Sequence, residues 1–142
     1  MPAIVVDCSV AVAWCFEDEA TVALDMLLDR VQTEGAIVPG SWMVEVANVL
    51  TGAVQRGRLS RETMHERLAL LDMLPIETDP RGVGPVWRSS VVALADMESL
   101  TAYDAVYLEL AMRHGLALAT CDRALRRAAA RRGIIVAPAD PA

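Results

Sequence analysis

The chain has 142 residues, the length of one domain of ordinary size. With 54% hydrophobic and 23% charged residues, its composition excludes disordered and low-complexity classes. The net charge of -6 argues against a protein that coats nucleic acid through a basic surface. All 13 basic residues are arginine, which excludes mechanisms that need a catalytic or phosphate-binding lysine, P-loop chemistry among them.

The amino-terminal segment lacks the basic start and the long apolar stretch of a signal peptide. No apolar run approaches the roughly 18 residues of a membrane helix. We therefore expect a cytoplasmic protein that does not enter a membrane. Cys8, Cys15 and Cys121 lack the spacing of a zinc site or a disulfide framework, so we expect small buried residues.

Short apolar runs alternate along the chain with longer segments of helical periodicity. In chain order, the patterns predict a strand at 3–6, helices at 9–14 and 21–32, a strand at 36–38, helices at 42–54 and 60–74, a strand at 76–78, helices at 86–97 and 101–114, a strand at 116–119, a helix at 122–132 and a strand at 134–136. Ser9 and Ser41 are predicted to cap their helices. Glu109 and Arg113 are predicted to pair on the solvent side of theirs.

The predicted strands are uniformly apolar, which is typical of a sheet that is covered on both faces. Alternation of strands with helices implies parallel pairing. The sequence therefore predicts an α/β fold, a three-layer sandwich with a parallel sheet of about five strands, in a single domain over residues 1–142.

Four acids stand alone in apolar surroundings, although ionised acids are rarely buried unless they are paired or bind a cation. Asp7 and Asp122 follow closely on predicted strands, where open α/β sheets have their ligand crevices. Helical projection places Asp104 on the core side of its helix. Glu45 lies at the edge of a wide apolar arc, with Asn48 one turn further on.

Taken singly, three of these acids have a structural explanation. Asp122 fits a helix N-cap, Asp104 a capping-box acid, and Asp7 an acid that favours a helix start. Glu45 is harder to explain in this way, because it lies beyond the first turn of its helix. If all four met, each like-charged pair about 5 Å apart would cost roughly 3 kcal/mol, and a divalent cation or protonation would be needed.

These residues resemble a known family, the PIN-domain ribonucleases, and within it the VapC-type toxins of bacterial toxin–antitoxin pairs. The resemblance covers nearly the whole chain and implies the strand order 3-2-1-4-5, which places Asp7 and Asp122 opposite each other. It is carried by four motifs: Val5-Val6-Asp7-Cys8-Ser9, Glu45-Val46-Ala47-Asn48 within 39–50, Tyr103-Asp104-Ala105 within 100–111, and Leu118-Ala119-Thr120-Cys121-Asp122.

The resemblance implies an endoribonuclease that depends on Mg²⁺ or Mn²⁺ and cleaves RNA phosphodiesters with a metal-activated water. It assigns the catalytic and metal-binding roles to Asp7, Glu45, Asp104 and Asp122. Ser9 and Thr120 match flanking hydroxyl positions that would orient carboxylates or bound water, and Asn48 is a further supporting residue.

Without lysine, the phosphates of RNA would have to be held by arginine. The best cluster, beside the predicted site, is Arg123, Arg126, Arg127, Arg131 and Arg132, of which the first three are predicted to bind RNA. The alternative explanation of this cluster is a solvated helix end that the helix dipole favours.

Three apolar residues are predicted to face away from the core: Val22, Met26 and Val44. A strip of this kind beside an acidic pocket suits an amphipathic segment that ends in a basic residue. The family resemblance implies the partner, a small antitoxin, and a homodimer within the complex. Packing on a neighbouring helix or a dimer mate is the alternative.

Two other classes of protein also place acids at the strand ends of such a sheet. Receiver-like and haloacid-dehalogenase-like phosphotransfer domains need a lysine, which this chain lacks. A non-catalytic PIN-like module that binds RNA or protein remains as the alternative function, and the four intact acids argue against it.

Overall fold

The structure is a computed structural model that describes residues 2–139. Its elements, in chain order, are β1 (Ile4–Val6), α1 (Cys8–Ala13), the 3-10 turn η1 (Glu17–Glu19), α2 (Val22–Glu34), β2 (Ala36–Pro39), α3 (Trp42–Gln55), α4 (Arg61–Asp72), β3 (Ile76–Asp79), the π-helical segment η2 (Trp87–Val91), α5 (Val92–Glu98), α6 (Ala102–His114), β4 (Ala117–Ala119), α7 (Arg123–Arg131) and β5 (Val136–Ala137). Among these residues, no helix has both the length and the apolar character of a membrane span.

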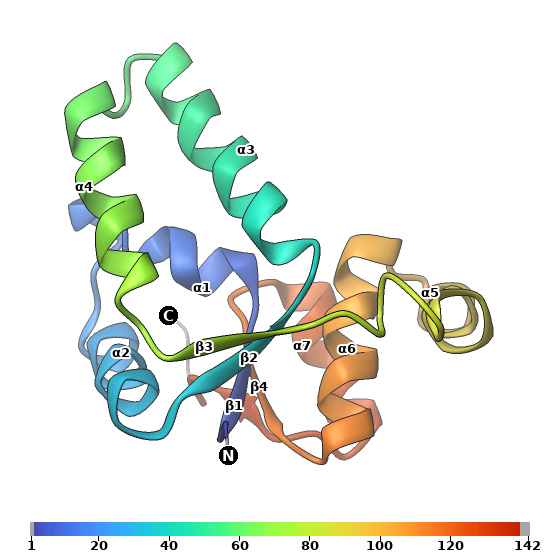
Figure 1. Cartoon of the computed structure of the whole chain (residues 1–142). Coiled ribbons are helices and arrows are strands. Elements are labelled where there is room, and N and C mark those ends of the chain that lie inside the picture. The colour runs from blue at the N-terminus through green and yellow to red at the C-terminus, as the bar shows by residue number, and fades with distance from the viewer. Residues whose placement is uncertain (1, 140–142) are drawn as a thin grey trace.

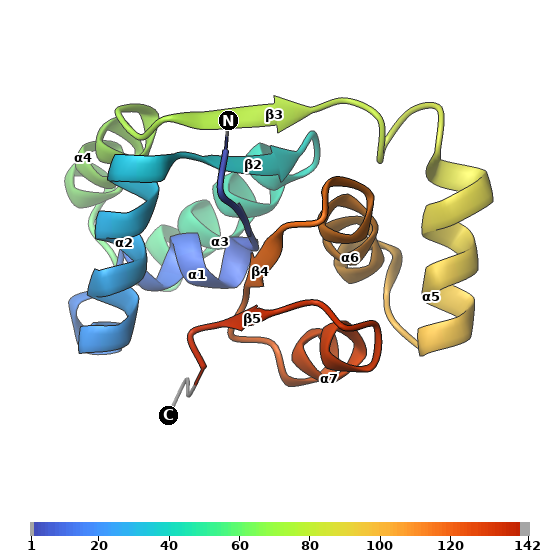
Figure 2. The same cartoon turned by 90° about the horizontal axis from the view of Figure 1, so that it is seen from below.

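The strands form one parallel sheet in the order β3-β2-β1-β4-β5, which confirms the predicted fold class and strand order. Helices α1 and α2 lie on one side of the sheet and α5, α6 and α7 on the other (Figure 2). Helices α3 and α4 form a hairpin that rises beyond the carboxyl ends of the central strands (Figure 1). The loops at this end of the sheet therefore meet below the hairpin.

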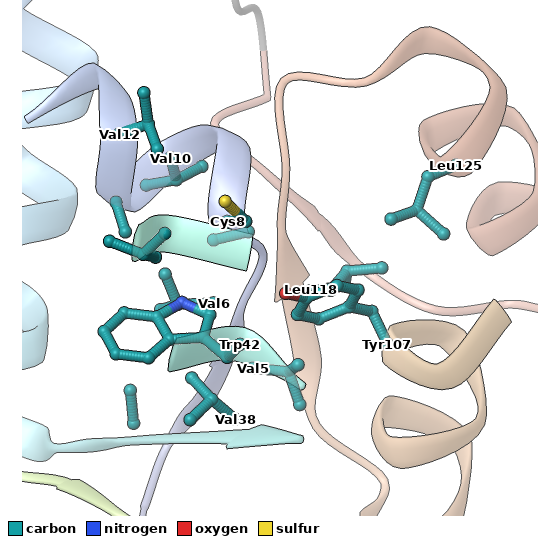
Figure 3. Close-up of a cluster of buried hydrophobic side chains, with 14 of the residues drawn as sticks. Val5, Val6, Cys8, Val10, Val12, Val38, Trp42, Tyr107, Leu118 and Leu125 are labelled. Carbon is teal, nitrogen blue, oxygen red and sulfur yellow. The ribbon is translucent and has the colours of Figure 1, made fainter. Parts of the chain in front are cut away.

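The core is centred on β1, whose three residues are fully buried. Figure 3 shows Tyr107 pointing from α6 towards the central strands, near Leu118 of β4. Both of these side chains are fully buried as well. Branched aliphatic side chains pack well on a pleated surface, which suits the buried residues of β1 to the centre of the core.

The helix cap predicted at Ser9 is wrong, whereas Ser41 is the N-cap residue of α3 but does not cap the helix with its side chain. Asp7 still has an extended backbone (φ -72°, ψ 152°) and its N–H donates to the carbonyl of Ala119 at 2.9 Å, so α1 begins directly after it at Cys8. Ser41 has helical dihedral angles (φ -74°, ψ -16°) and its hydroxyl makes no capping bond. The pairing of β1 with β4 thus extends as far as Asp7, and α1 can start only after this residue.

Two other element boundaries also differ from the prediction. The last strand begins at Val136 instead of 134, because the N–H of Ile134 closes the end of α7 by donating to the carbonyl of Ala129 at 2.9 Å. The predicted helix at 86–97 is divided into the π-helical segment η2 and the α-helix α5.

Glu109 and Arg113 pair as predicted, but they do not face solvent, because Glu109 is only 5% exposed. The end of β3 packs against this face of α6 and adds a second carboxylate, that of Asp79. Arg113 donates from Nε to Glu109 Oε1 and from Nη2 to Asp79 Oδ2, each at 2.7 Å. Burial raises the pKa of Asp79, but the hydrogen bonds from Arg113 and from the backbone of Gly82 and Arg81, together with the charge of Arg113, outweigh it and hold the pKa below its ordinary value.

We predict that Arg113→Met lowers the free energy of unfolding by about 3–5 kcal/mol, since it leaves two buried carboxylates without their cation. Urea unfolding followed by circular dichroism measures this loss. The matched control is Arg30→Met, which breaks the exposed pair of Arg30 with Glu34 and should cost at most about 0.5 kcal/mol. Equal losses in the two variants would contradict a stabilising role for the buried cation.

Candidate active site

A cleft of about 760 Å³ opens at the carboxyl end of β1 and β4. Asp7 follows β1, Asp104 lies in the first turn of α6, and Asp122 is at the N-cap of α7. Glu45 lies in the first turn of α3, not beyond it as predicted, because α3 begins at Trp42 and the N–H of Glu45 donates to the carbonyl of Ser41. All four of these acids line the cleft. The structure thus brings together in one place the four carboxylates that the sequence analysis singles out.

Asp7 is 4% exposed and is held by two hydroxyl groups. Ser9 Oγ donates to its Oδ2 at 2.8 Å, and Thr120 Oγ1 donates to the same oxygen at 2.6 Å. The hydroxyl of Ser9 accepts from the N–H of Cys121 at 3.0 Å, and that of Thr120 from the N–H of Asp122 at 3.1 Å. Burial raises the pKa of Asp7, and the two hydroxyls offset part of this effect.

Glu45 is oriented by Tyr107, whose hydroxyl donates to Glu45 Oε1 at 2.9 Å. Burial raises the pKa of Glu45; the bond from Tyr107 lowers it, and the charge of Asp7 raises it further. Burial and the neighbouring carboxylates also raise the pKa of the Tyr107 hydroxyl, which therefore remains a neutral donor. The sequence analysis does not single out Tyr107, because its periodicity marks it only as a core residue.

Asp104 and Asp122 lie at the starts of two helices. The N–H of Asp104 donates to Thr101 Oγ1 at 3.1 Å, so Thr101 is the residue that caps α6. Asp122 caps α7 by accepting from the N–H of Leu125 at 2.8 Å, and it lines the cleft at the same time. Burial, together with the charges of Asp122 and Asp7, raises the pKa of Asp104 to about 6.

The chemistry of this donor set suits a hard divalent cation. Carboxylate oxygens are the ligands that Mg²⁺ prefers, and Mg²⁺ contacts only one or two of them while it keeps several waters. Within residues 2–139, no three histidine, cysteine, aspartate or glutamate side chains are close enough to hold one ion together. The cleft therefore fits a hydrated cation held by few carboxylates, and does not form an all-protein cage.

The predicted RNA-binding arginines have different environments. Arg126 donates from Nη1 to the carbonyl of Thr120 at 2.7 Å and from Nη2 to that of Pro138 at 2.6 Å, so it ties the end of β4 to the segment after β5. Arg123 and Arg127 are exposed on α7. These two guanidinium groups are accessible to a phosphate, whereas that of Arg126 is engaged with the backbone.

Four other residues predicted to support the site or bind a partner lie outside the cleft lining. Asn48 is exposed on α3. Val22, Met26 and Val44 are 77%, 66% and 72% exposed, so within the described chain they do not pack on another helix.

The cleft also contains an arginine that the sequence analysis does not single out. Arg58 follows α3 and is the only cation among the residues that line the cleft within 2–139. Its Nη2 donates to Glu19 Oε2 at 2.7 Å and to Asp18 Oδ1 at 3.3 Å. These partners precede it by 39 and 40 residues, so no local pattern could have indicated the contact.

Comparisons with known proteins agree with this geometry. The family model of the PIN domain matches residues 4–131. No curated protein matches the chain.

The solved structures to which the chain is similar share its fold at low identity. PAE2754 from Pyrobaculum aerophilum is 23% identical over 95% of this chain and 83% of that chain, with a TM-score of 0.70. FitAcB from Neisseria gonorrhoeae is 20% identical over 97% of both chains, with a TM-score of 0.63. A toxin–antitoxin complex from Klebsiella pneumoniae is 18% identical over 84% of this chain and 86% of that chain, with a TM-score of 0.54. Since the PIN model spans most of the sequence, the chain belongs to the PIN domain family, a family of nucleases.

Proposed function

We propose that this chain is a metal-dependent endoribonuclease and the toxin of a type II, VapBC-like toxin–antitoxin pair. The observation that carries the proposal is the convergence of Asp7, Glu45, Asp104 and Asp122 in one cleft. Three of these carboxyl groups have raised pKa values, and neighbouring carboxylates contribute to the shifts of Glu45 and Asp104. Acids that disfavour each other's ionisation are stabilised by a bound cation, and such perturbed groups cluster at functional sites. Membership of the PIN family supports the same conclusion.

Two of the four carboxylates are held in place by neighbouring hydroxyl groups. When bound, Mg²⁺ or Mn²⁺ supplies positive charge and lowers the pKa of water, as phosphodiester hydrolysis requires. Ser9 and Thr120 hold Asp7 in one orientation, and Tyr107 does the same for Glu45. These hydroxyls therefore pre-organise the ligand oxygens before the RNA arrives.

The exposed side chains of Arg123 and Arg127 are proposed to hold RNA phosphates beside Asp122. They extend from the helix that Asp122 caps, and arginine binds phosphate through a planar fork of donors. Arg126 would instead support this surface, since its donors are occupied by backbone carbonyls.

The first test of the nuclease is to neutralise one acid at a time. Asp7→Asn and Asp104→Asn should keep the fold, because the amide is nearly isosteric, and should each reduce RNA cleavage at least 100-fold, about 2.7 kcal/mol of barrier. Initial rates on labelled RNA in Mg²⁺ measure the loss, and circular dichroism checks the fold. Asp72→Asn, an exposed acid on α4, is the matched control and should cleave like the wild type.

Removal of metal gives a second, independent readout for the same assay. Excess EDTA should abolish cleavage by the wild-type protein, and added Mg²⁺ or Mn²⁺ should restore it. Full activity of Asp104→Asn, or undiminished cleavage in EDTA, would refute the proposal.

The raised pKa of Asp104 predicts how the stability of the metal-free protein depends on pH. The folded state holds this proton up to about pH 6, whereas the unfolded state loses it near the ordinary value of 3.8. The folded state thus binds more protons, and Asp104 makes an unfavourable contribution that develops as the pH rises between these values. Asp104→Asn should remove that contribution.

In EDTA, Asp104→Asn should therefore be more stable than the wild type by about 1–2 kcal/mol near pH 7.5, after allowance for solvent screening. Near pH 3.5 the difference should disappear, because the wild-type carboxyl is then protonated in both states. Urea unfolding at the two pH values measures this difference in the free energy of unfolding, with Asp72→Asn as the control. A difference that does not change with pH would contradict a raised pKa at Asp104.

We propose that the protein partner is a small antitoxin, which binds this chain through Val22, Met26 and Val44. We further propose that this chain forms a homodimer within the complex. These side chains form no contact that would bury them within the described chain. One of the structures with a similar fold is itself a toxin–antitoxin complex. Apolar residues beside an acidic cleft suit an amphipathic segment that carries a basic residue. We expect expression of the chain alone to be toxic, and the product of a short adjacent gene to relieve the toxicity.

The double variant Val22→Glu with Met26→Glu should keep RNA cleavage and lower the affinity for that product at least tenfold, about 1.4 kcal/mol. Titration calorimetry measures the affinity. Met97→Glu serves as control, since Met97 is also exposed but lies on α5, across the sheet from α2 (Figure 2). Unchanged binding by the double variant would show that the partner binds to another surface. Failure of any adjacent product to bind would refute the toxin assignment and leave the nuclease proposal intact.

A further inference from the structure

The cleft presents a problem of charge to an RNA substrate. Six carboxylates line it, those of Asp7, Asp18, Glu19, Glu45, Asp104 and Asp122. The single guanidinium among the lining residues of the described chain is that of Arg58. One or two divalent cations would offset only part of this negative charge. A positively charged side chain inside the cleft would further reduce the repulsion of a polyanion that enters it.

Arg58 is held in a defined position. Its guanidinium lies 3.8 Å from the centre of the Phe16 ring, which is a short cation–π distance, and Phe16 itself is buried. Glu19 and Asp18 accept hydrogen bonds from Nη2. Three contacts, with Phe16 just before η1 and with Asp18 and Glu19 within it, thus fix a side chain that comes from the loop between α3 and α4.

The guanidinium nevertheless remains accessible. The Arg58 side chain is 42% exposed, and its partner Asp18 is 74% exposed. Exposed ion pairs contribute little to stability, so a phosphate can take the place of one carboxylate at small cost. The only side-chain hydrogen bonds of Arg58 in the described chain come from Nη2, which leaves other donors of the planar fork for a second partner.

We propose that Arg58 binds a backbone phosphate of the RNA next to the cleaved bond, and that Phe16, Asp18 and Glu19 position its guanidinium for this contact. The inference rests on the proposed ribonuclease function and extends it, because it names a substrate-binding residue on the α3–α4 hairpin, opposite the arginines of α7. Asp18 and Glu19 are positioning residues that also compete with the RNA for the same cation.

A purely structural role of Arg58 predicts the opposite effect on RNA binding for the double variant Asp18→Asn with Glu19→Gln. If Arg58 only ties the α3–α4 loop to η1, then Arg58→Ala and the double variant Asp18→Asn with Glu19→Gln break the same tie and have effects of the same sign. If Arg58 binds phosphate, loss of the arginine weakens RNA binding. Loss of the two acids strengthens it, because the cation is no longer shared and the cleft is less negative.

The test is fluorescence anisotropy with a labelled single-stranded RNA, in Mg²⁺, with every variant built on Asp7→Asn so that the RNA is not cut. Arg58→Ala should raise Kd about tenfold at low salt, as loss of a charged hydrogen-bond partner does. It should also reduce the slope of log Kd against log salt by about 0.7. Arg58→Lys keeps the charge but not the planar guanidinium, so its Kd should lie between those of the Asp7→Asn parent and Arg58→Ala. The double variant Asp18→Asn with Glu19→Gln should lower Kd. Arg56→Ala removes an exposed arginine of the same loop that does not line the cleft, and should change nothing.

Steady-state cleavage with Asp7 intact provides the second readout. Arg58→Ala should raise KM with kcat changed less than twofold, since the phosphate contact is made before and during the reaction. Unchanged Kd and salt slope in Arg58→Ala, or weaker binding in both Arg58→Ala and the double acid variant, would overturn the inference. Failure of the proposed function has a different signature: the wild-type protein would cleave no RNA, while the anisotropy series would still decide whether Arg58 binds it.

Discussion

The burial of one carboxylate, that of Asp7, at the end of the central strand is the constraint on which the site depends. A buried charge is unfavourable unless polar groups surround it, and here the hydroxyls of Ser9 and Thr120 do so. The same hydroxyls accept from the N–H groups of Cys121 and Asp122, at the end of the neighbouring strand. The pairing of β1 with β4 therefore determines at once the position of Asp7 and that of the loop that carries Asp122.

Helix α6 shows that this molecule treats buried acids in two ways. Near its carboxyl end, Glu109 and Asp79 share the guanidinium of Arg113, so their charges are balanced within the protein. At its amino end, Asp104 lies near Asp122 and Asp7, and within residues 2–139 no ion pair involves these three acids. The first arrangement stabilises the fold. The second leaves a negative potential that a cation from solution can neutralise, at a cost in stability to the metal-free protein.

For the proposed function, this electrostatic arrangement accounts for how an acidic chain would bind an anionic substrate. The negative potential is concentrated at the cleft, where a divalent cation would reverse its effect on a phosphate. Arg58 lines the cleft beside η1, and Arg123 and Arg127 lie on α7, the helix that Asp122 caps. A distribution of this kind favours binding of RNA only when the cation is present, whereas a uniformly basic surface would bind nucleic acid in any state.

Local patterns in the sequence predicted the strands, most of the helices, and the positions of Asp7, Asp104 and Asp122 relative to them. The period of a helix or strand and the end of an apolar run are properties of neighbouring residues. The strand order came from the family resemblance. The tertiary structure alone decided the contacts between distant segments: Tyr107 with Glu45 across 62 residues, Arg113 with Asp79 across 34, and Arg58 with Glu19 across 39. Each of these depends on which helices, strands and loops the fold brings together. That is determined by packing of the whole chain, not by any pattern within a single segment.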